Sequence, residues 1–307
     1  MSDFALTGIV PPVATPFTDA GEVDFVSLER LIEFLLDAGV HGLFMLGTTS
    51  ETALLTGAER VAIVESAVRV AAGRVPIMAG TLDTSTNRVI ENAMAVRDAG
   101  AQAIVVTAPF YLRFSQDEIV AHFHAIKRAI DLPIVAYDIP STTHSKIEPA
   151  TMIRLFDDGT IIGLKDSSGE ETAFRGLLIA AETRPGFAVM TGSEQTIDGS
   201  LAAGAAGVVP GLGNVDPHGF VRIWNASQAG DYAGAVAAQK QLFKLEPIVR
   251  TGNAARMGLH ACVLGSYKTA LMLRGVIETN AMGRPLTRFD AEDTERVRAI
   301  LEQADLL

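Results

Sequence analysis

Residues 98–105 read Asp98-Ala99-Gly100-Ala101-Gln102-Ala103-Ile104-Val105, and two further segments follow the same order of residue types. They are Asp37-Ala38-Gly39-Val40-His41-Gly42-Leu43-Phe44 and Ala202-Ala203-Gly204-Ala205-Ala206-Gly207-Val208-Val209. In each segment a helix is expected to end, a glycine takes the left-handed conformation of a helix cap, and a buried strand begins. A helix-to-strand joint that recurs along the chain predicts repeated βα units.

Short apolar runs alternate with amphipathic segments over most of the chain. The runs are continuous rather than alternating in polarity, which is typical of parallel strands covered on both faces. They lie at 8–14, 42–46, 75–79, 103–106, 133–137, 161–165, 187–190 and 207–209. Helices are expected between them, for example at 24–36, 58–71, 86–99 and 116–129.

These units predict an α/β fold, the (β/α)₈ or TIM barrel, which takes about 250 residues. We expect residues 1–219 to form the barrel that carries the active site. Residues 220–307 should form a C-terminal helical extension packed on the barrel as part of a single structural unit. Its helices are expected near 220–227, 232–248, 254–273 and 291–304. A doubly wound open sheet is the main structural alternative.

The composition excludes several classes of partner. Hydrophobic residues make up 48% of the chain and charged residues 20%, which favours a well-buried globular protein over a disordered one. The net charge of −11 argues against nucleic acid or an anionic membrane as partner. The N-terminus, Met1 to Phe4, lacks a signal-peptide pattern, and no long apolar segment occurs, so we expect a cytoplasmic protein.

No metal or cofactor is expected. Cys262 is the only cysteine, which leaves neither an intrachain disulfide nor a thiolate cluster. His122 and His124 are two residues apart on an expected helix and therefore point away from each other.

Lys165 is the unusual residue of the strand at 161–165. It ends an apolar run, so folding should draw its ammonium group towards a medium of low dielectric constant and favour the neutral amine. A neutral amine attacks carbonyl groups, which is the chemistry of Schiff-base enzymes. The alternative is that Lys165 extends its ammonium into solvent or onto a carboxylate.

Other polar residues follow the expected strands at the end where barrel active sites lie. Thr48 and Thr49, in the turn that begins at Gly47, offer hydroxyl and backbone N–H groups suited to a carboxylate, although they could also serve only as helix caps. Tyr137 is placed to act as general acid/base at an imine, with Thr48 or Thr49 and then Tyr111 relaying the proton to solvent.

The strand at 187–190 is followed by Thr191-Gly192-Ser193-Glu194-Gln195. These polar groups could hold a hydroxylated second substrate. Glu194 could equally be a solvated charge in the first turn of a helix.

Four motifs now appear in order at successive strand ends. They are Gly47-Thr48-Thr49-x-Glu51, Pro109-Phe110-Tyr111, Tyr137-x-Ile139-Pro140 and Gly163-Leu164-Lys165-Asp166-x-Ser168-Gly169. They resemble the signatures of the dihydrodipicolinate synthase / N-acetylneuraminate lyase family of pyruvate-dependent class I aldolases. The likeness covers residues 8–217 and extends more loosely through the tail.

The resemblance implies a role for each matching residue. Lys165 would be the Schiff-base lysine, Tyr137 the acid/base, and Thr48 and Thr49 the binders of the pyruvate carboxylate. Val209 would lie near the pyruvate methyl group. Tyr111 matches an aromatic residue that in some members serves the neighbouring subunit, and the family is usually a tetramer of two tight dimers.

The departures from the family pattern bear on the second substrate. Dihydrodipicolinate synthases have a carboxylate-binding arginine where this chain has Thr142, and a neutral threonine cannot replace a bidentate guanidinium. We expect Gly192, Glu194, Ser167 and Thr142 to line the second-substrate region. Asp138 and His144 stand where asparagine and glycine are usual.

The resulting hypothesis is a lyase that joins pyruvate reversibly to an aldehyde, or acts on a related 2-keto-3-deoxy sugar acid, through an imine on Lys165. Dihydrodipicolinate synthase or N-acetylneuraminate lyase activity proper is an alternative. A non-catalytic keto-acid-binding protein of the same fold, or a barrel hydrolase using Glu51 and Glu194, would belong to other classes. Lys268, on a tail helix, is expected to extend its ammonium to solvent.

Overall fold

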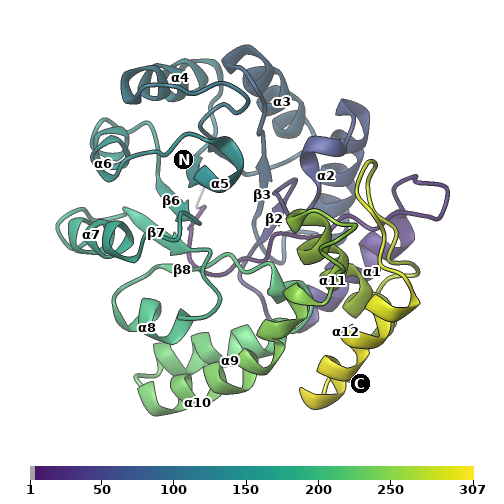
Figure 1. Ribbon diagram of the computed structural model, residues 1–307. Helices are drawn as coiled ribbons and strands as arrows, with labels where there is room; N and C mark the ends of the chain where they lie inside the picture. Colours follow the sequence, from purple (N-terminus) through teal and green to yellow (C-terminus); the bar gives the residue numbers. More distant parts are fainter. Residues whose placement is uncertain (1–3) are drawn as a thin grey trace.

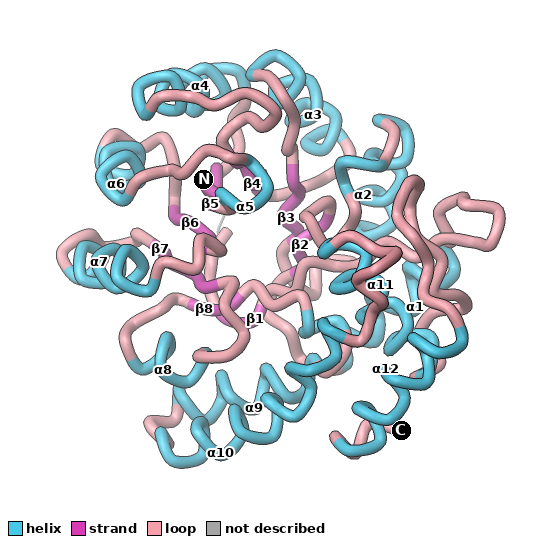
Figure 2. Tube along the Cα trace, viewed as in Figure 1, coloured by secondary structure: helices cyan, strands magenta, loops and turns pink. Residues whose placement is uncertain are grey.

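The computed structural model describes residues 4–307, which form one closed barrel of parallel strands (Figures 1 and 2). Met1 to Asp3, part of the N-terminal segment used above, lie outside the described residues. The strands follow the order β1-β8-β7-β6-β5-β4-β3-β2, and a parallel bridge from Pro12 to Phe44 joins the two ends of this row. The barrel prediction is therefore confirmed, and the open doubly wound sheet is wrong.

The eight strands lie close to the predicted positions. They are β1 Gly8–Ile9, β2 Leu43–Met45, β3 Ile77–Gly80, β4 Ala103–Thr107, β5 Ile134–Asp138, β6 Gly163–Asp166, β7 Ala188–Thr191 and β8 Gly207–Val208. Only β1 is much shorter than the run at 8–14, because Pro11 and Pro12 have no N–H to donate to a neighbouring strand.

Helices cover the outside of the barrel. They are α1 Phe25–Asp37, α2 Gly57–Ala71, α3 Thr86–Asp98, α4 Gln116–Ala129, α6 Pro149–Asp157, α7 Glu171–Glu182 and α8 Ile197–Ala202. The short helix α5 Pro140–Thr143 instead lies at the mouth of the barrel (Figure 1). The repeated joint has the predicted geometry, since Gly39, Gly100 and Gly204 have φ of 82°, 100° and 96°. No helix in the described part of the chain is both long and apolar enough to cross a membrane.

Apolar side chains pack on both faces of the sheet. The inner cluster includes Phe44, Val105, Val135 and Met190, and a larger cluster lies between the strands and the helices. Apolar side chains therefore cover both faces of the sheet, as the continuous apolar runs predicted. A polar side chain on the inner face then needs a functional explanation.

The tail helices gather on one side of the barrel, between α8 and α1 (Figure 1). They are α9 Pro217–Gln228, α10 Tyr232–Leu242, α11 Leu259–Leu273 and α12 Ala291–Gln303, with the 3₁₀ helix η3 Phe243–Arg250 between α10 and α11. Two further 3₁₀ turns lie in the barrel, η1 Thr52–Leu54 after β2 and η2 Leu212–Asn214 after β8. The single helix expected at 232–248 is wrong: α10 ends and η3 takes over before Pro247, whose ring an α-helix interior excludes. The helix expected at 254–273 begins only at Leu259, after Gly258.

Candidate active site

Lys165 lies on the inner face of the barrel. Side chains alternate along β6, so Lys165 points inward and Asp166 points towards the helices. Tyr137 on β5 is its register partner, and Lys165 Nζ lies 4.3 Å from the centre of the Tyr137 ring. The lysine is 6% exposed and joins none of the ion pairs among the described residues, so the solvent-directed alternative is wrong.

The amine faces a cavity of about 250 Å³ at the carboxyl ends of the strands. The structure brings most of the predicted site residues together there: Thr48, Thr49, Tyr137, Lys165, Ser167, Gly192, Glu194 and Val209 all line it. The other ring beside the amine is that of Phe44, 5.5 Å from Nζ to the ring centre. The nucleophile is thus held between aromatic rings and a polar wall.

The turn from Gly47 to Glu51 supplies the groups suited to a carboxylate. Gly47 is buried against the Phe44 ring, where a Cβ would come within 2.9 Å of a ring carbon. Glu51 N donates to Thr48 O at 3.0 Å, and Ser50 Oγ donates to Val13 O at 2.6 Å. Across the described residues, no hydrogen bond is found from the N–H groups of Thr48 and Thr49. They are therefore free to bind an anion.

Glu194 lies in the cavity wall, before α8 rather than in its first turn. Leu212 N donates to Glu194 Oε1 at 2.7 Å, and the Tyr267 hydroxyl is also hydrogen-bonded to this carboxyl group. Burial raises the pKa of Glu194 to about 7, against the opposing effects of these donors and of the Lys165 charge. The carboxyl can therefore hold or release a proton near neutral pH. The alternative that Glu194 is a solvated charge in the first turn of a helix is wrong.

Sequence reasoning missed the contribution of the tail. Leu259, His260, Val263, Leu264 and Tyr267, all on α11, line the cavity that contains Lys165. Their spacing along the chain is typical of one helix face, but it does not tell which part of the barrel that face covers.

Three predicted residues lie outside this cavity. Gly47, which we expected to bind substrate, begins the turn but packs against the Phe44 ring instead of lining the cavity. Thr142, on α5, lines an adjacent apolar hollow of about 260 Å³ that shares Thr48, Ile139 and His260 with the cavity. Tyr111 lines neither hollow; it is 85% exposed and has a φ of 80°, a conformation rare for a bulky side chain.

The structure explains the two unusual residues near Tyr137. Asp138 points away from the cavity, where Oδ2 lies 2.5 Å from Lys146 Nζ and Oδ1 accepts a hydrogen bond from Ile147 N at 3.0 Å. Burial raises the pKa of Asp138, against the hydrogen bond from Lys146. His144 ends α5 with a φ of 57°, a left-handed position that suits glycine and that histidine tolerates. Neither residue disturbs the Lys165–Tyr137 pair.

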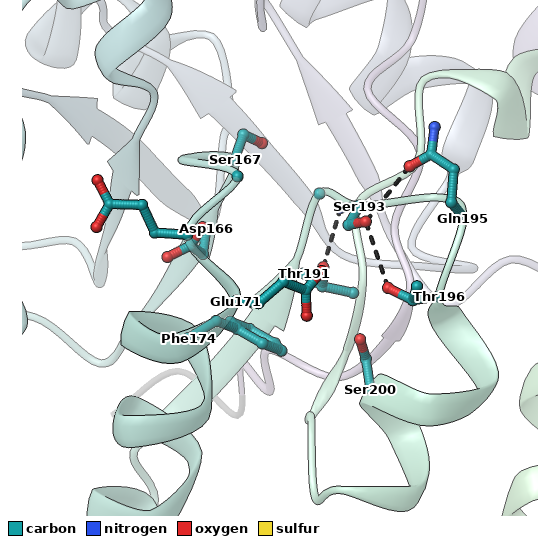
Figure 3. Close-up of a pocket in the computed structure, with 12 residues that line it drawn as sticks. Asp166, Ser167, Glu171, Phe174, Thr191, Ser193, Gln195, Thr196 and Ser200 are labelled. Carbon is teal, nitrogen blue, oxygen red and sulfur yellow. Dashed lines mark hydrogen bonds between the residues drawn. The ribbon is translucent and has the colours of Figure 1, made fainter.

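A second hollow, of about 220 Å³, lies beside the cavity between the loops that follow β6 and β7 (Figure 3). Ser167 and Gly192 line both spaces. Its wall is rich in hydroxyl groups, including those of Thr191 and Thr196, and Ser193 N donates to Thr191 Oγ1 at 2.9 Å. The side of the cavity formed by β6 and β7 is therefore polar.

Lys268 does not extend to solvent, so that prediction is wrong. It is 1% exposed and forms an ion pair with Glu51, because the side of α11 that carries it packs against the Gly47–Glu51 turn. Glu51 is bound by Lys268, whereas Glu194 is bound by Leu212 N in the cavity wall. The two residues therefore do not form the carboxylate pair of a hydrolase. Among residues 4–307 no group of three or more His, Cys, Asp or Glu side chains is arranged to hold a metal ion.

Comparisons with known proteins identify the family of the chain. Residues 5–304 match the model of the dihydrodipicolinate synthetase family. A curated relative, "Uncharacterized DapA-like lyase" of Halobacterium salinarum, is 32% identical over 98% of this chain and 95% of its own length. The 4-hydroxy-tetrahydrodipicolinate synthase of Exiguobacterium sibiricum is 39% identical over 75% of this chain and 78% of its own.

Solved structures show the same fold along the whole chain. YagE, a prophage protein of the dihydrodipicolinic acid synthase family from E. coli K12 solved in complex with pyruvate, superposes with a TM-score of 0.91. It is 29% identical, and the match covers 98% of this chain and 99% of that one. The chain therefore belongs to the dihydrodipicolinate synthetase family and is an enzyme of the lyase class.

Proposed function

We propose that Lys165 forms an imine with pyruvate, and that the enzyme uses it for reversible aldol cleavage or condensation with an aldehyde, or for dehydration of a related 2-keto acid. The observation that carries the proposal is the buried amine of Lys165, 4.3 Å from the Tyr137 ring centre in a cavity at the strand ends. The pyruvate complex of the E. coli relative supports pyruvate as the ligand.

The cavity provides a group for each step. The free N–H and hydroxyl groups of Thr48 and Thr49 bind the pyruvate carboxylate, and Val209 faces the methyl group. The Lys165 amine attacks the carbonyl carbon, and the Tyr137 phenol donates the proton with which the hydroxyl of the carbinolamine leaves as water. The Tyr137 phenolate formed in that step then accepts a proton from the methyl group, which gives the enamine that attacks the aldehyde carbon. Hydrolysis of the resulting imine releases the product and restores the Lys165 amine. We propose that no metal or cofactor takes part.

The lining favours an uncharged, hydroxylated second substrate. Thr142 is neutral, and Lys146, the next basic residue along the chain, is engaged by Asp138 outside the cavity. Glu194 and Ser167 instead offer hydrogen bonds to hydroxyl groups. A 2-keto-3-deoxy sugar acid therefore fits this site better than aspartate semialdehyde, whose carboxylate would lack a cationic partner.

A non-catalytic binding protein is not favoured. That hypothesis required Asp138 or His144 to disrupt proton transfer, and both side chains lie outside the cavity. We also propose a homotetramer built from two dimers, supported by the exposed Tyr111. The cytoplasmic location stays a prediction.

Imine formation is tested by reduction with borohydride in the presence of pyruvate. The wild-type enzyme should gain a stable adduct on Lys165, detected by mass spectrometry, and Lys165→Ala should gain none. Tyr137→Phe should still be trapped but turn over about 10²–10⁴-fold more slowly, because it lacks the phenol proton. Absence of adduct from the wild-type enzyme would overturn the proposal.

The second substrate is tested with a panel of 2-keto-3-deoxy acids, N-acetylneuraminate and aspartate semialdehyde, assayed for pyruvate release or consumption. We expect the highest kcat/KM with a 2-keto-3-deoxy sugar acid. A preference for aspartate semialdehyde would contradict the argument from Thr142.

A further inference from the structure

A buried ion pair connects the tail to the carboxylate-binding turn. Lys268 on α11 is 1% exposed, and Glu51, the last residue of the Gly47–Glu51 turn, is 4% exposed. Lys268 Nζ pairs with Glu51 Oε1 and donates to Ala281 O at 2.9 Å. Glu51 Oε2 accepts a hydrogen bond from Gly283 N at 2.7 Å. Both charged groups are therefore held on several sides.

Stability alone does not account for this arrangement. Two charges taken out of water lose their hydration, and apolar residues of similar volume are often as stabilising as a buried pair. Glu51 also has a φ of 57°, a left-handed conformation that is unfavourable for a residue with a side chain. Strained backbone of this kind concentrates at functional sites, where the surrounding structure holds it in place.

The Glu51–Lys268 ion pair affects the active site indirectly, through the Gly47–Glu51 turn. Neither Glu51 nor Lys268 lines the cavity that contains Lys165, but Glu51 N donates to Thr48 O at 3.0 Å within the turn. Fixing the Glu51 carboxylate therefore fixes the direction of the Thr48 and Thr49 N–H groups. On α11 the neighbour of Lys268 is Tyr267, which faces the cavity, so the same helix both lines the site and anchors the turn.

We propose that Glu51 and Lys268 are positioning residues for pyruvate. Their ion pair holds the Gly47–Glu51 turn in the shape that binds the carboxylate, which makes α11 part of the catalytic unit. The inference rests on the proposed imine chemistry, because its measure is pyruvate binding at Lys165.

The test compares Glu51→Gln, Lys268→Met and the double variant by borohydride trapping over a range of pyruvate concentrations. All three variants should need at least about tenfold more pyruvate for half-maximal trapping. A misplaced binding group can slow imine formation by up to about 10²-fold, so a change of this size is expected when the turn loses its shape. The maximal adduct should stay close to that of the wild type, since Lys165 and Tyr137 are unchanged.

The double variant separates positioning from stability. The single variants leave a buried group without its partner and should lower Tm, whereas the double variant has no unpaired charge and should recover most of that loss. If the pair positions the turn, the pyruvate requirement stays raised in the double variant. A wild-type pyruvate requirement in the double variant would overturn the inference and leave the imine proposal intact.

A matched control lies in the same tail. Asp293 on α12 is also fully buried and pairs with Arg256 and Arg296, away from the cavity. Asp293→Asn should lower Tm without changing the pyruvate requirement, and a comparable rise in that requirement would also overturn the inference. A wild-type enzyme that gives no adduct would instead refute the imine proposal and, with it, this inference.

Discussion

Gly192 lies beside the reacting lysine, where a side chain would be crowded. A Cβ at this position would lie 2.1 Å from Ser167 Oγ, 3.1 Å from Asp166 O and 3.3 Å from Lys165 Cε. The serine hydroxyl can rotate away, but the backbone oxygen and the lysine stem cannot move without disturbing β6. The absence of a side chain at Gly192 therefore leaves the space that the lysine stem occupies.

Gly192→Ala should reduce trapping of pyruvate on Lys165 by about tenfold or more, because displacement of a reacting group by a fraction of an ångström is costly. Gly199→Ala is the control, since a Cβ on that α8 glycine meets nothing within 4 Å. Equal trapping in the two variants would show that the lysine does not depend on this contact.

At the scale of elements, α11 and the loop before α8 meet through Glu194 and Tyr267. Burial raises the pKa of Glu194 from 4.5 to about 7, so the folded protein keeps a proton that the unfolded chain has lost above pH 4.5. A group that binds a proton more tightly when folded stabilises the fold at low pH, and this contribution disappears as the pH rises through its folded pKa.

The free energy of unfolding of the wild type should therefore fall relative to that of Glu194→Gln between pH 4.5 and pH 7. The expected difference is about 3 kcal/mol, from 1.4 kcal/mol for each pH unit. Urea unfolding of both proteins across this interval measures it, and parallel pH profiles would contradict the assignment.

The strands and the residues at their ends could be predicted because both follow from local patterns. Continuous apolar runs gave the positions of the strands along the chain. Parallel strands place their carboxyl ends on one rim, so Thr48, Tyr137 and Lys165 had to meet. The role of Asp138 could not be predicted, because it depends on which way Lys146 turns after α5.

The contacts of the tail could not be predicted either, because they depend on packing between segments that are far apart in the sequence. Whether Lys268 reaches solvent depends on what covers α11, and its partner Glu51 belongs to a turn far away along the chain. The contribution of Tyr267 to the cavity was missed because a helix pattern shows which residues share a face, not what that face touches.

At the scale of the whole molecule, the loop after β4 is unusual for a surface that faces only water. Tyr111 and Leu112 are 85% and 60% exposed, and Tyr111 is held in a strained conformation. Large exposed apolar side chains that lie together mark contact surfaces between proteins. They support the proposal that this loop meets a second subunit.

Sedimentation of the wild-type protein should give the mass of four chains. Tyr111→Asp should shift it to smaller species and lower turnover, because a charge is unfavourable in the interior of an interface. The exposed Tyr232→Asp change on α10 is a control for added surface charge. A wild-type protein that sediments as a monomer would contradict the proposed assembly.

The wall that α11 adds to the cavity has a consequence for the newly made protein. Lys165 emerges from the ribosome roughly a hundred residues before Lys268, an interval of about 5–20 seconds at ordinary rates of translation. Until α11 docks, one wall of the cavity around the Lys165 amine is missing, and the Gly47–Glu51 turn lacks its ion pair with Lys268. We therefore expect a nascent chain to form the pyruvate imine only after α11 has been made and has docked.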